Sequence, residues 1–355
     1  MSELSVNFFW QTDMNYIKDS LKFILKHNFR MYKNVHEEEI RIAGFSADVY
    51  IPRKNRTTIL LIHGMSSRGN KDHRIVSLSR SFASAGYKVI TPHFKKIASL
   101  KIEKSEIKDI VKIIKAISAD KDLIKYDRIG IFSASFSGAL ALIAAADSSV
   151  KDRISSILIV GGYGDVQSTI EKLIESTNHD DYAAMITFYN FIELASGKKP
   201  DLSKAFFLAA MDDSKNTDTL TPHLQKLNAN DRNLFYRLKT DPHARINYWK
   251  KILKGAEKRN IHIDDLSPYP ILENIDAAVT FIHGRNDTVI LPEQSVKMHE
   301  KLIKHGKKSR LLLTPILSHG NVSLGISRFA AIFELAKAFS FFFRNMRKFR
   351  EKNIS

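Results

Sequence analysis

Short apolar runs without polar alternation constrain the fold of this chain most. Six of them begin at residues 57, 88, 128, 154, 277 and 309 and read "TTILLIHG", "KVITP", "RIGIF", "ISSILIVGG", "AAVTFIHG" and "SRLLLTP". Such runs are typical of strands buried on both faces of a sheet. Helical patterns separate most of them, and "EIRIAGFSADVYIP" adds two strands joined at Gly44. We therefore predict an α/β fold with a mostly parallel sheet of about eight strands and helices on both faces.

The pattern changes in the middle of the chain, where strand-like runs vanish and aromatic-rich helical stretches replace them. This segment, 163–270, is predicted to be a helical insertion between two strands of the sheet. Residues 37–162 and 271–355 then form the α/β core, and residues 1–36 form an N-terminal helical extension. The insertion's aromatic residues are expected to form mainly its own core, with a minority lining an apolar pocket. They are Phe188, Tyr189, Phe191, Phe206, Phe207, Phe235, Tyr236 and Trp249.

Composition excludes several classes of site and partner. The 355 residues include no cysteine, so a disulfide, a thiolate metal site and a cysteine nucleophile are all excluded. No signal peptide and no apolar run of membrane-spanning length is recognised, which predicts a cytoplasmic protein. The net charge of +17 is concentrated near the C-terminal "RNMRKFREK". We expect a solvated helix end there, with weak contact to anionic membranes as the alternative and no nucleic-acid partner.

The stretch "RIGIFSASFSGALALIAA" places Ser133, Ser135 and Ser137 where a strand gives way to a helix of small residues. Serine is common in turns and at helix starts. A serine hydroxyl becomes a nucleophile when a base removes its proton and a third group orients that base. A strained strand-to-helix turn would lift the middle hydroxyl above the sheet and aim the helix N-terminus at a developing oxyanion.

Ser133 to Ser137 resembles the G-x-S-x-G nucleophile elbow of the α/β-hydrolase fold superfamily, with serine in place of both glycines. The resemblance implies that Ser135 is the nucleophile, with Ser137 as the alternative. It further implies that Met65, after the "LLIHG" strand, and Phe136 supply the backbone N–H groups of the oxyanion hole. His63 is expected to pack and hydrogen-bond near the site without a catalytic role. The resemblance also implies that the helical insertion over 163–270 is a cap.

The same resemblance assigns the acid and the base. "FIHGRND" is similar to the superfamily's acid-bearing loop and implies Asp287, with Asp165 in "GGYGD" as the runner-up. The superfamily's order of serine, acid and histidine places the base after Asp287. His319 follows a strand in "LSHGN", whereas His299 and His305 lie on or at the end of a surface helix, so His319 is the predicted base.

These residues predict a serine hydrolase that cleaves a carboxylic ester, with an apolar acyl group, through an acyl-enzyme. A peptidase or thioesterase of the same fold is one alternative, and a catalytically silent lipid-surface binding protein is another. The chemistry implies a small-molecule or lipid ester as partner and no cofactor, and no metal-ligand spacing is recognised.

The two ends of the chain carry apolar helical patterns. Three consecutive phenylalanines, Phe341 to Phe343, cannot all face one sheet because successive helical residues point about 100° apart. We expect the helix predicted over 13–32 and the C-terminal helix to cover each other's apolar faces. An exposed interfacial membrane anchor is the competing interpretation.

Overall fold

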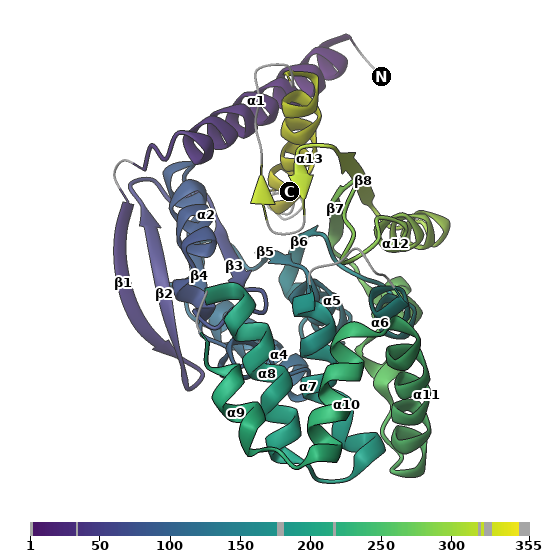
Figure 1. The fold of residues 1–355 in the computed structure, drawn as a ribbon. Helices are drawn as coiled ribbons and strands as arrows, with labels where there is room; N and C mark the ends of the chain where they lie inside the picture. Colours follow the sequence, from purple (N-terminus) through teal and green to yellow (C-terminus); the bar gives the residue numbers. More distant parts are fainter. Residues whose placement is uncertain are drawn as a thin grey trace. The chain divides into compact units, whose positions relative to one another are not determined.

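The computed structural model describes residues 3–32, 35–175, 181–215, 218–318, 321–322 and 329–347. These residues form two compact units (Figure 1). The first unit comprises Met1–Gly164, Pro268–Asp287 and Pro292–Ser355, and the second comprises Asp165–Ser267 and Thr288–Leu291.

A single eight-stranded sheet organises the first unit in the order β1-β2-β4-β3-β5-β6-β7-β8. Its strands are β1 (Val35–Ile42), β2 (Phe45–Pro52), β3 (Thr58–Ile62), β4 (Lys88–Pro92), β5 (Ile129–Ala134), β6 (Ile154–Val160), β7 (Ala278–Gly284) and β8 (Ser309–Thr314). The β1–β2 and β2–β4 pairs are antiparallel, and all pairs from β4 to β8 are parallel. The predicted mostly parallel sheet of about eight strands is confirmed.

The β1–β2 hairpin turns at Ala43 and Gly44, both of which have positive φ angles, 51° and 90°. Two successive positive φ angles are the requirement of the tight hairpin turn whose twist matches that of its strands. The central strand β3 is buried along its whole length. Its unbroken apolar run therefore has a simple cause, since helices cover both of its faces.

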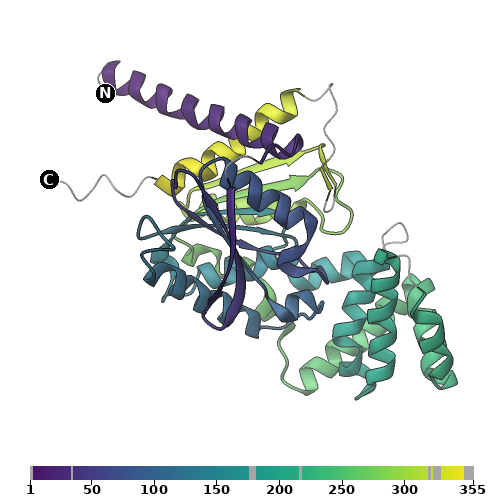
Figure 2. The same ribbon diagram turned by 90° about the vertical axis from the view of Figure 1, so that its left-hand side faces the viewer.

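Helices cover both faces of this sheet (Figures 1 and 2), as predicted. One layer contains α1 (Glu3–Asn28), α2 (His73–Ser84) and α13 (Phe329–Arg347), and the other contains α4 (Ser105–Ala119), α5 (Phe136–Ala145) and α12 (Glu293–Lys304). Short segments complete the unit: η1 (Gly69–Lys71), α3 (Lys95–Ala98), η2 (Lys151–Arg153), η4 (Tyr269–Asn274), β9 (Leu317–Ser318) and β10 (Asn321–Val322).

The first helix starts ten residues earlier than the predicted 13–32, at Glu3. The added residues contain no proline or glycine, so nothing in them interrupts helical hydrogen bonding. In the part of the chain that the structure describes, no helix combines the length and the apolar character needed to cross a membrane.

The expected packing of the two terminal helices is confirmed (Figure 2). The Phe23 ring of α1 lies 4.7 Å from that of Phe339 and 5.8 Å from that of Phe343, both on α13. Phe342 and Phe343 are fully buried, and Phe341 is half-buried, as the helical geometry requires. α13 also approaches β5 closely, because a Cβ atom at Gly130 would lie 2.2 Å from Met346 Sδ.

The second unit is helical: α6 (Val166–Glu175), α7 (Asp181–Ser196), α8 (Pro200–Lys215), α9 (Leu220–Lys226), α10 (Ala229–Thr240), α11 (Pro242–Lys258) and η3 (Ile263–Leu266). The main segment of this unit is Asp165–Ser267, and the helical insertion was predicted over 163–270. Five of the eight aromatic residues considered above are buried in it: Phe188, Phe191, Phe206, Phe235 and Trp249. Gly255 lets α11 approach α7, since a Cβ there would lie 1.9 Å from Leu194 O.

We predict that Phe343→Ala strongly destabilises the first unit. Phe343 is fully buried and stacks on Tyr87 at 4.6 Å, so its removal leaves a cavity beneath α1 and α13. The expected loss is about 3–5 kcal/mol of unfolding free energy, measured by chemical denaturation. Phe333→Ala on the same helix is the control, because Phe333 is 43% exposed and should change stability by less than about 1 kcal/mol. Equal effects would contradict this account of the packing.

Candidate active site

Ser135 occupies the turn between β5 and α5 with φ 55° and ψ −137°. A positive φ is uncommon for a residue other than glycine and marks a conformation that the surroundings must hold in place. Ser135 N donates to Val160 O at 2.9 Å, and Gly138 N donates to Ser135 O at 2.9 Å. Although serine favours the cap position, the Ser135 side chain does not cap α5. The turn is therefore held by backbone hydrogen bonds, and the Ser135 side chain is not used to cap the helix.

The two flanking serines bond to the neighbouring strand. Ser137 Oγ donates to His63 O at 2.7 Å, and Ser133 Oγ donates to Ile62 O at 3.3 Å. Both side chains are buried, whereas Ser135 is only half-buried. The replacements of the two motif glycines thus tie the turn to β3, and they distinguish Ser137, the alternative nucleophile, from Ser135.

Two glycines around the turn remain necessary because the chain passes close to itself there. A Cβ atom at Gly138 would lie 2.7 Å from Ile159 Cγ2, and one at Gly162 would lie 2.5 Å from the same atom. The start of α5 can therefore lie directly against the end of β6. Its N-terminal N–H groups face the end of the sheet where Ser135 lies, a favourable position for binding an anion.

Met65 and Phe136 come from the ends of neighbouring strands. β3 and β5 are adjacent and parallel, with Ile62 paired to Ser133. A Cβ atom at Gly64 would lie 3.8 Å from Ala134 O, so the chain leaving β3 runs beside the end of β5. Phe136 is the first residue of α5 and its N–H has no acceptor within the helix. The two predicted oxyanion-hole segments are thus brought to one edge of the sheet.

His63 is fully buried and hydrogen-bonded at both ring nitrogens. Nδ1 lies 2.9 Å from Gly64 O, and Nε2 accepts the Phe94 N–H at 3.1 Å. These partners require a neutral ring with its proton on Nδ1. Burial lowers the His63 pKa to about 4, so the ring stays neutral at physiological pH. His63 joins the segments after β3 and β4, in line with the packing role expected for it.

Asp287 follows β7 and is buried. Its N–H donates to Gly284 O at 3.2 Å, and its Oδ2 lies 3.6 Å from His283 Nε2. A Cβ atom at Gly161, just after β6, would lie 3.5 Å from Asp287 Oδ2. The carboxylate therefore lies at the same edge of the sheet as the elbow, one strand beyond β6.

Asp165, the runner-up acid, has a different environment. It is exposed, and its Oδ1 accepts the Ser168 N–H at 2.7 Å at the start of α6. This arrangement is a helix cap, which accounts for an aspartate at that position.

The predicted base, His319, lies outside the described residues. Leu317, two residues before it in sequence, lies against the end of β7, since a Cβ atom at Gly284 would be 2.4 Å from Leu317 O. Of the alternatives, His299 hydrogen-bonds Ser309 Oγ at 2.8 Å, and the exposed His305 bonds Lys301 O at 2.8 Å. Both are engaged with α12 or its neighbouring strand, β8.

Sequence reasoning did not identify His283 as part of this site. Its side chain is fully buried, four residues before Asp287, and Nδ1 lies 2.7 Å from Ser295 Oγ. A sequence signal was present, because the two apolar runs that contain β3 and β7 both end in the same "IHG" triplet. Among the residues that the structure describes, no group of three or more acidic or histidine side chains could hold a metal ion.

Comparison with known proteins supports the fold. The model of the prolyl oligopeptidase family matches residues 232–348, which include Asp287 and His319 but not Ser135. The uncomplexed acylaminoacyl peptidase of Pyrococcus horikoshii is 16% identical with a TM-score of 0.52, over 91% of this chain and 44% of that one. A puromycin-hydrolyzing peptidase of Mycobacterium tuberculosis is also 16% identical with a TM-score of 0.52, over 88% and 40%.

This chain thus spans less than half the length of either peptidase. At 16% identity these likenesses establish the fold, which is that of the α/β hydrolases. Comparison of the sequence with curated proteins finds no match.

We predict that Ser137→Ala destabilises the first unit, because it removes the donor that the buried His63 carbonyl uses. The expected cost is about 1–3 kcal/mol of unfolding free energy by chemical denaturation. Ser148→Ala, at an exposed position after α5, should change stability by less than about 0.5 kcal/mol. If the two variants unfold alike, Ser137 does not tie the elbow to β3.

Proposed function

We propose that this chain, which has the fold of the α/β hydrolases, is a serine hydrolase that cleaves a carboxylic ester through an acyl-enzyme. The observation that carries the proposal is the left-handed backbone at Ser135, between the end of β5 and the start of α5. Strain of this kind is retained where a side chain must project from a fixed turn. The match to the prolyl oligopeptidase family supports the serine hydrolase class.

The proposed reaction assigns one role to each predicted residue. Ser135 Oγ attacks the carbonyl carbon while His319 takes its proton and later returns it to the leaving group. The Met65 and Phe136 N–H groups stabilise the oxyanion, assisted by the positive end of α5. Water, deprotonated by His319, then releases the acid from Ser135.

Asp287 orients the His319 ring and stabilises its charged form in this proposal. Its burial supports the role, because a buried carboxylate requires compensating partners. The capping bond and exposure of Asp165 weigh against it as the acid.

Two candidate functions, esterase and peptidase, differ in the bond that is cleaved. An ester is easier to cleave than an amide because an alkoxide leaves more readily than an amine anion, so a triad that hydrolyses amides is also expected to hydrolyse activated esters. Peptide cleavage is the second candidate, favoured by the family match over residues 232–348. Thioester cleavage and a silent lipid-surface role have no comparable support.

An apolar acyl group remains part of the proposal. Aromatic residues of the helical unit are the proposed basis of this preference for an apolar acyl group. Five of the eight aromatic residues are buried in that unit's own core. A cytoplasmic location and weak contact of the basic C-terminus with anionic membranes stay predictions.

We predict that Ser135→Ala lowers hydrolysis by at least about a thousandfold, because neither flanking hydroxyl can replace the nucleophile. The measurement uses a p-nitrophenyl ester and the p-nitroanilide with the same acyl group. Both rates should fall together, and a fluorophosphonate probe should label the wild-type chain at Ser135.

Ser148→Ala is the control, because this serine is exposed after α5 and the variant should remain reactive toward the probe. Labelling at Ser137, or near-normal turnover by the Ser135 variant, would refute the assignment. A wild-type chain that cleaves the ester and not the anilide is an esterase, and cleavage of both favours the peptidase candidate.

We predict that Asp287→Asn slows ester hydrolysis by about a thousandfold or more, whereas Asp165→Asn leaves it within a few-fold of wild type. Asparagine preserves the shape of the acid but favours the wrong tautomer of the base. Steady-state kcat/KM for both variants provides the measurement. Small and equal losses would show that neither residue is the acid.

A further inference from the structure

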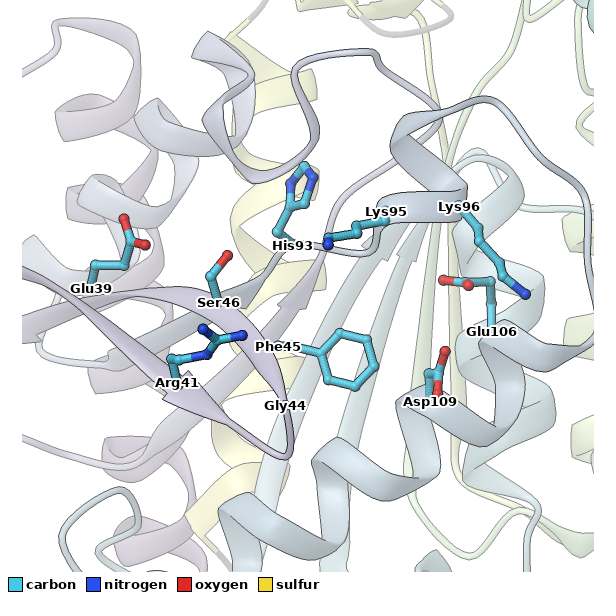
Figure 3. A pocket seen from close by; sticks show the side chains of 10 residues that line it. All are labelled: Glu39, Arg41, Gly44, Phe45, Ser46, His93, Lys95, Lys96, Glu106 and Asp109. Carbon is cyan, nitrogen blue, oxygen red and sulfur yellow. The ribbon is translucent and has the colours of Figure 1, made fainter.

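A pocket of about 510 Å3 lies in the first unit and is formed by elements that carry none of the predicted catalytic residues (Figure 3). The β1–β2 hairpin, the segment that follows β4 and the first turns of α4 surround it. Its volume falls within the range of sites for small molecules. β4 runs parallel to β3, so the pocket lies at the same edge of the sheet as the predicted active site.

Glu106 is the most unusual residue of this pocket. It belongs to the first turn of α4, is 2% exposed, and its Oε2 has no hydrogen-bond partner among the described residues. Burial, with the nearby charge of Asp109, raises the Glu106 pKa to about 7. Figure 3 shows the carboxyl group directed toward the Phe45 ring, inside the pocket. A buried polar atom without a partner is costly, and a ligand that donates a hydrogen bond would remove that cost.

Two other charged residues of the pocket have charged partners. Lys96 donates to Glu103 at 2.5 Å and to Ser105 Oγ at 2.7 Å, which leaves little net charge at that position. Glu39 lies 3.6 Å from Lys71, which also donates to Asp48 at 2.5 Å.

The remaining charges are separated into an acidic end and a basic end. Glu106 and Asp109 lie on one side of the Phe45 ring, and Arg41 lies on the other (Figure 3). The side chains of Arg41, Asp109 and the exposed Lys95 form no hydrogen bond or ion pair within the described part of the chain. A simple cation would be repelled by the basic end, and a simple anion would be repelled by the acidic end.

We propose that this pocket binds a small zwitterion of the amino-acid or short-peptide class. The ammonium group binds between Glu106 and Asp109, the carboxylate binds Arg41, and the Phe45 ring contacts the apolar part of the ligand. Arg41 suits a carboxylate because its guanidinium group can donate two parallel hydrogen bonds. The proposal does not depend on the proposed hydrolase activity.

Proton release accompanies binding, because the ammonium group requires the ionised form of Glu106. Several charged or titratable groups surround Glu106: Asp109 on α4, Lys95 and Lys96 on α3, Glu103 before α4, His93 after β4, and Glu39 and Arg41 on β1. The affinity should therefore rise from pH 5 to pH 7, by up to about tenfold per unit below the pKa. The ligand's own amine stays protonated over this interval.

The test is isothermal titration calorimetry of the full-length chain at pH 7 with three probes. L-leucine carries both charges, L-leucinamide carries only the ammonium, and N-acetyl-L-leucine carries only the carboxylate. We expect saturable binding of L-leucine and at least tenfold weaker binding of the other two. Binding of either analogue as tightly as L-leucine, or no saturable binding at millimolar concentration, would overturn the proposal.

Variants locate the site. Glu106→Gln and Arg41→Gln should each weaken L-leucine binding at least tenfold, and the first should also abolish the pH dependence. Glu38→Gln is the matched control, an exposed carboxylate of β1 outside the pocket. Ser135→Ala should bind L-leucine like the wild type, which separates this proposal from the hydrolase proposal. Unchanged affinity in the Glu106 variant would overturn it.

Thermal unfolding shows whether a loss of binding reflects misfolding. The raised pKa of Glu106 means that its protonated form stabilises the native state at low pH and that this stability is lost as the pH rises toward 7. Without ligand, Glu106→Gln should therefore have a Tm at pH 8 about 2 °C or more above the wild type, with a smaller gap at pH 5. A lower Tm at both pH values would assign Glu106 a structural role and overturn the proposal.

Discussion

The left-handed backbone at Ser135 is the constraint on which the rest of the candidate site depends. One residue changes the chain direction from β5 to α5, and its side chain does not cap the helix that follows. Support comes instead from Val160 O, which accepts the Ser135 N–H, and from the serines on either side, which bond the end of β3. Three adjacent strands therefore hold one strained residue in place.

The same edge of the sheet brings together residues that are far apart in sequence. Gly161 and Gly284 leave room for Asp287 and for the backbone of Leu317 at the ends of β6 and β7. Both glycines lie where strands end, so their missing side chains permit close approach without loss of core volume. This packing gives Asp287, the proposed acid, a buried position beside His283, whereas Asp165 caps a helix in the other unit.

The pocket around Glu106 follows from the antiparallel side of the sheet. The β1–β2 hairpin adds two strands beyond β4, and its turn carries Phe45 toward the start of α4. The buried carboxyl of Glu106 is costly in an empty pocket, and α4 tolerates it because Ile110, Ile113, Ile114 and Ile117 bury its apolar face. The proposed second site thus uses none of the residues of the elbow.

Much of the fold was determined by the sequence itself. The unbroken apolar runs that became β3 and β4 could be buried only in a covered parallel sheet, and "SASFS" marked the elbow. Local pattern could not determine the bonds made by Ser133 and Ser137, because their acceptors lie 71 and 74 residues away. Tertiary structure also determines the partners of His283 and the lack of a hydrogen-bond partner at Glu106 Oε2. Both depend on which distant elements pack together. Periodicity specifies what a segment can bury, and only tertiary structure decides what it is buried against.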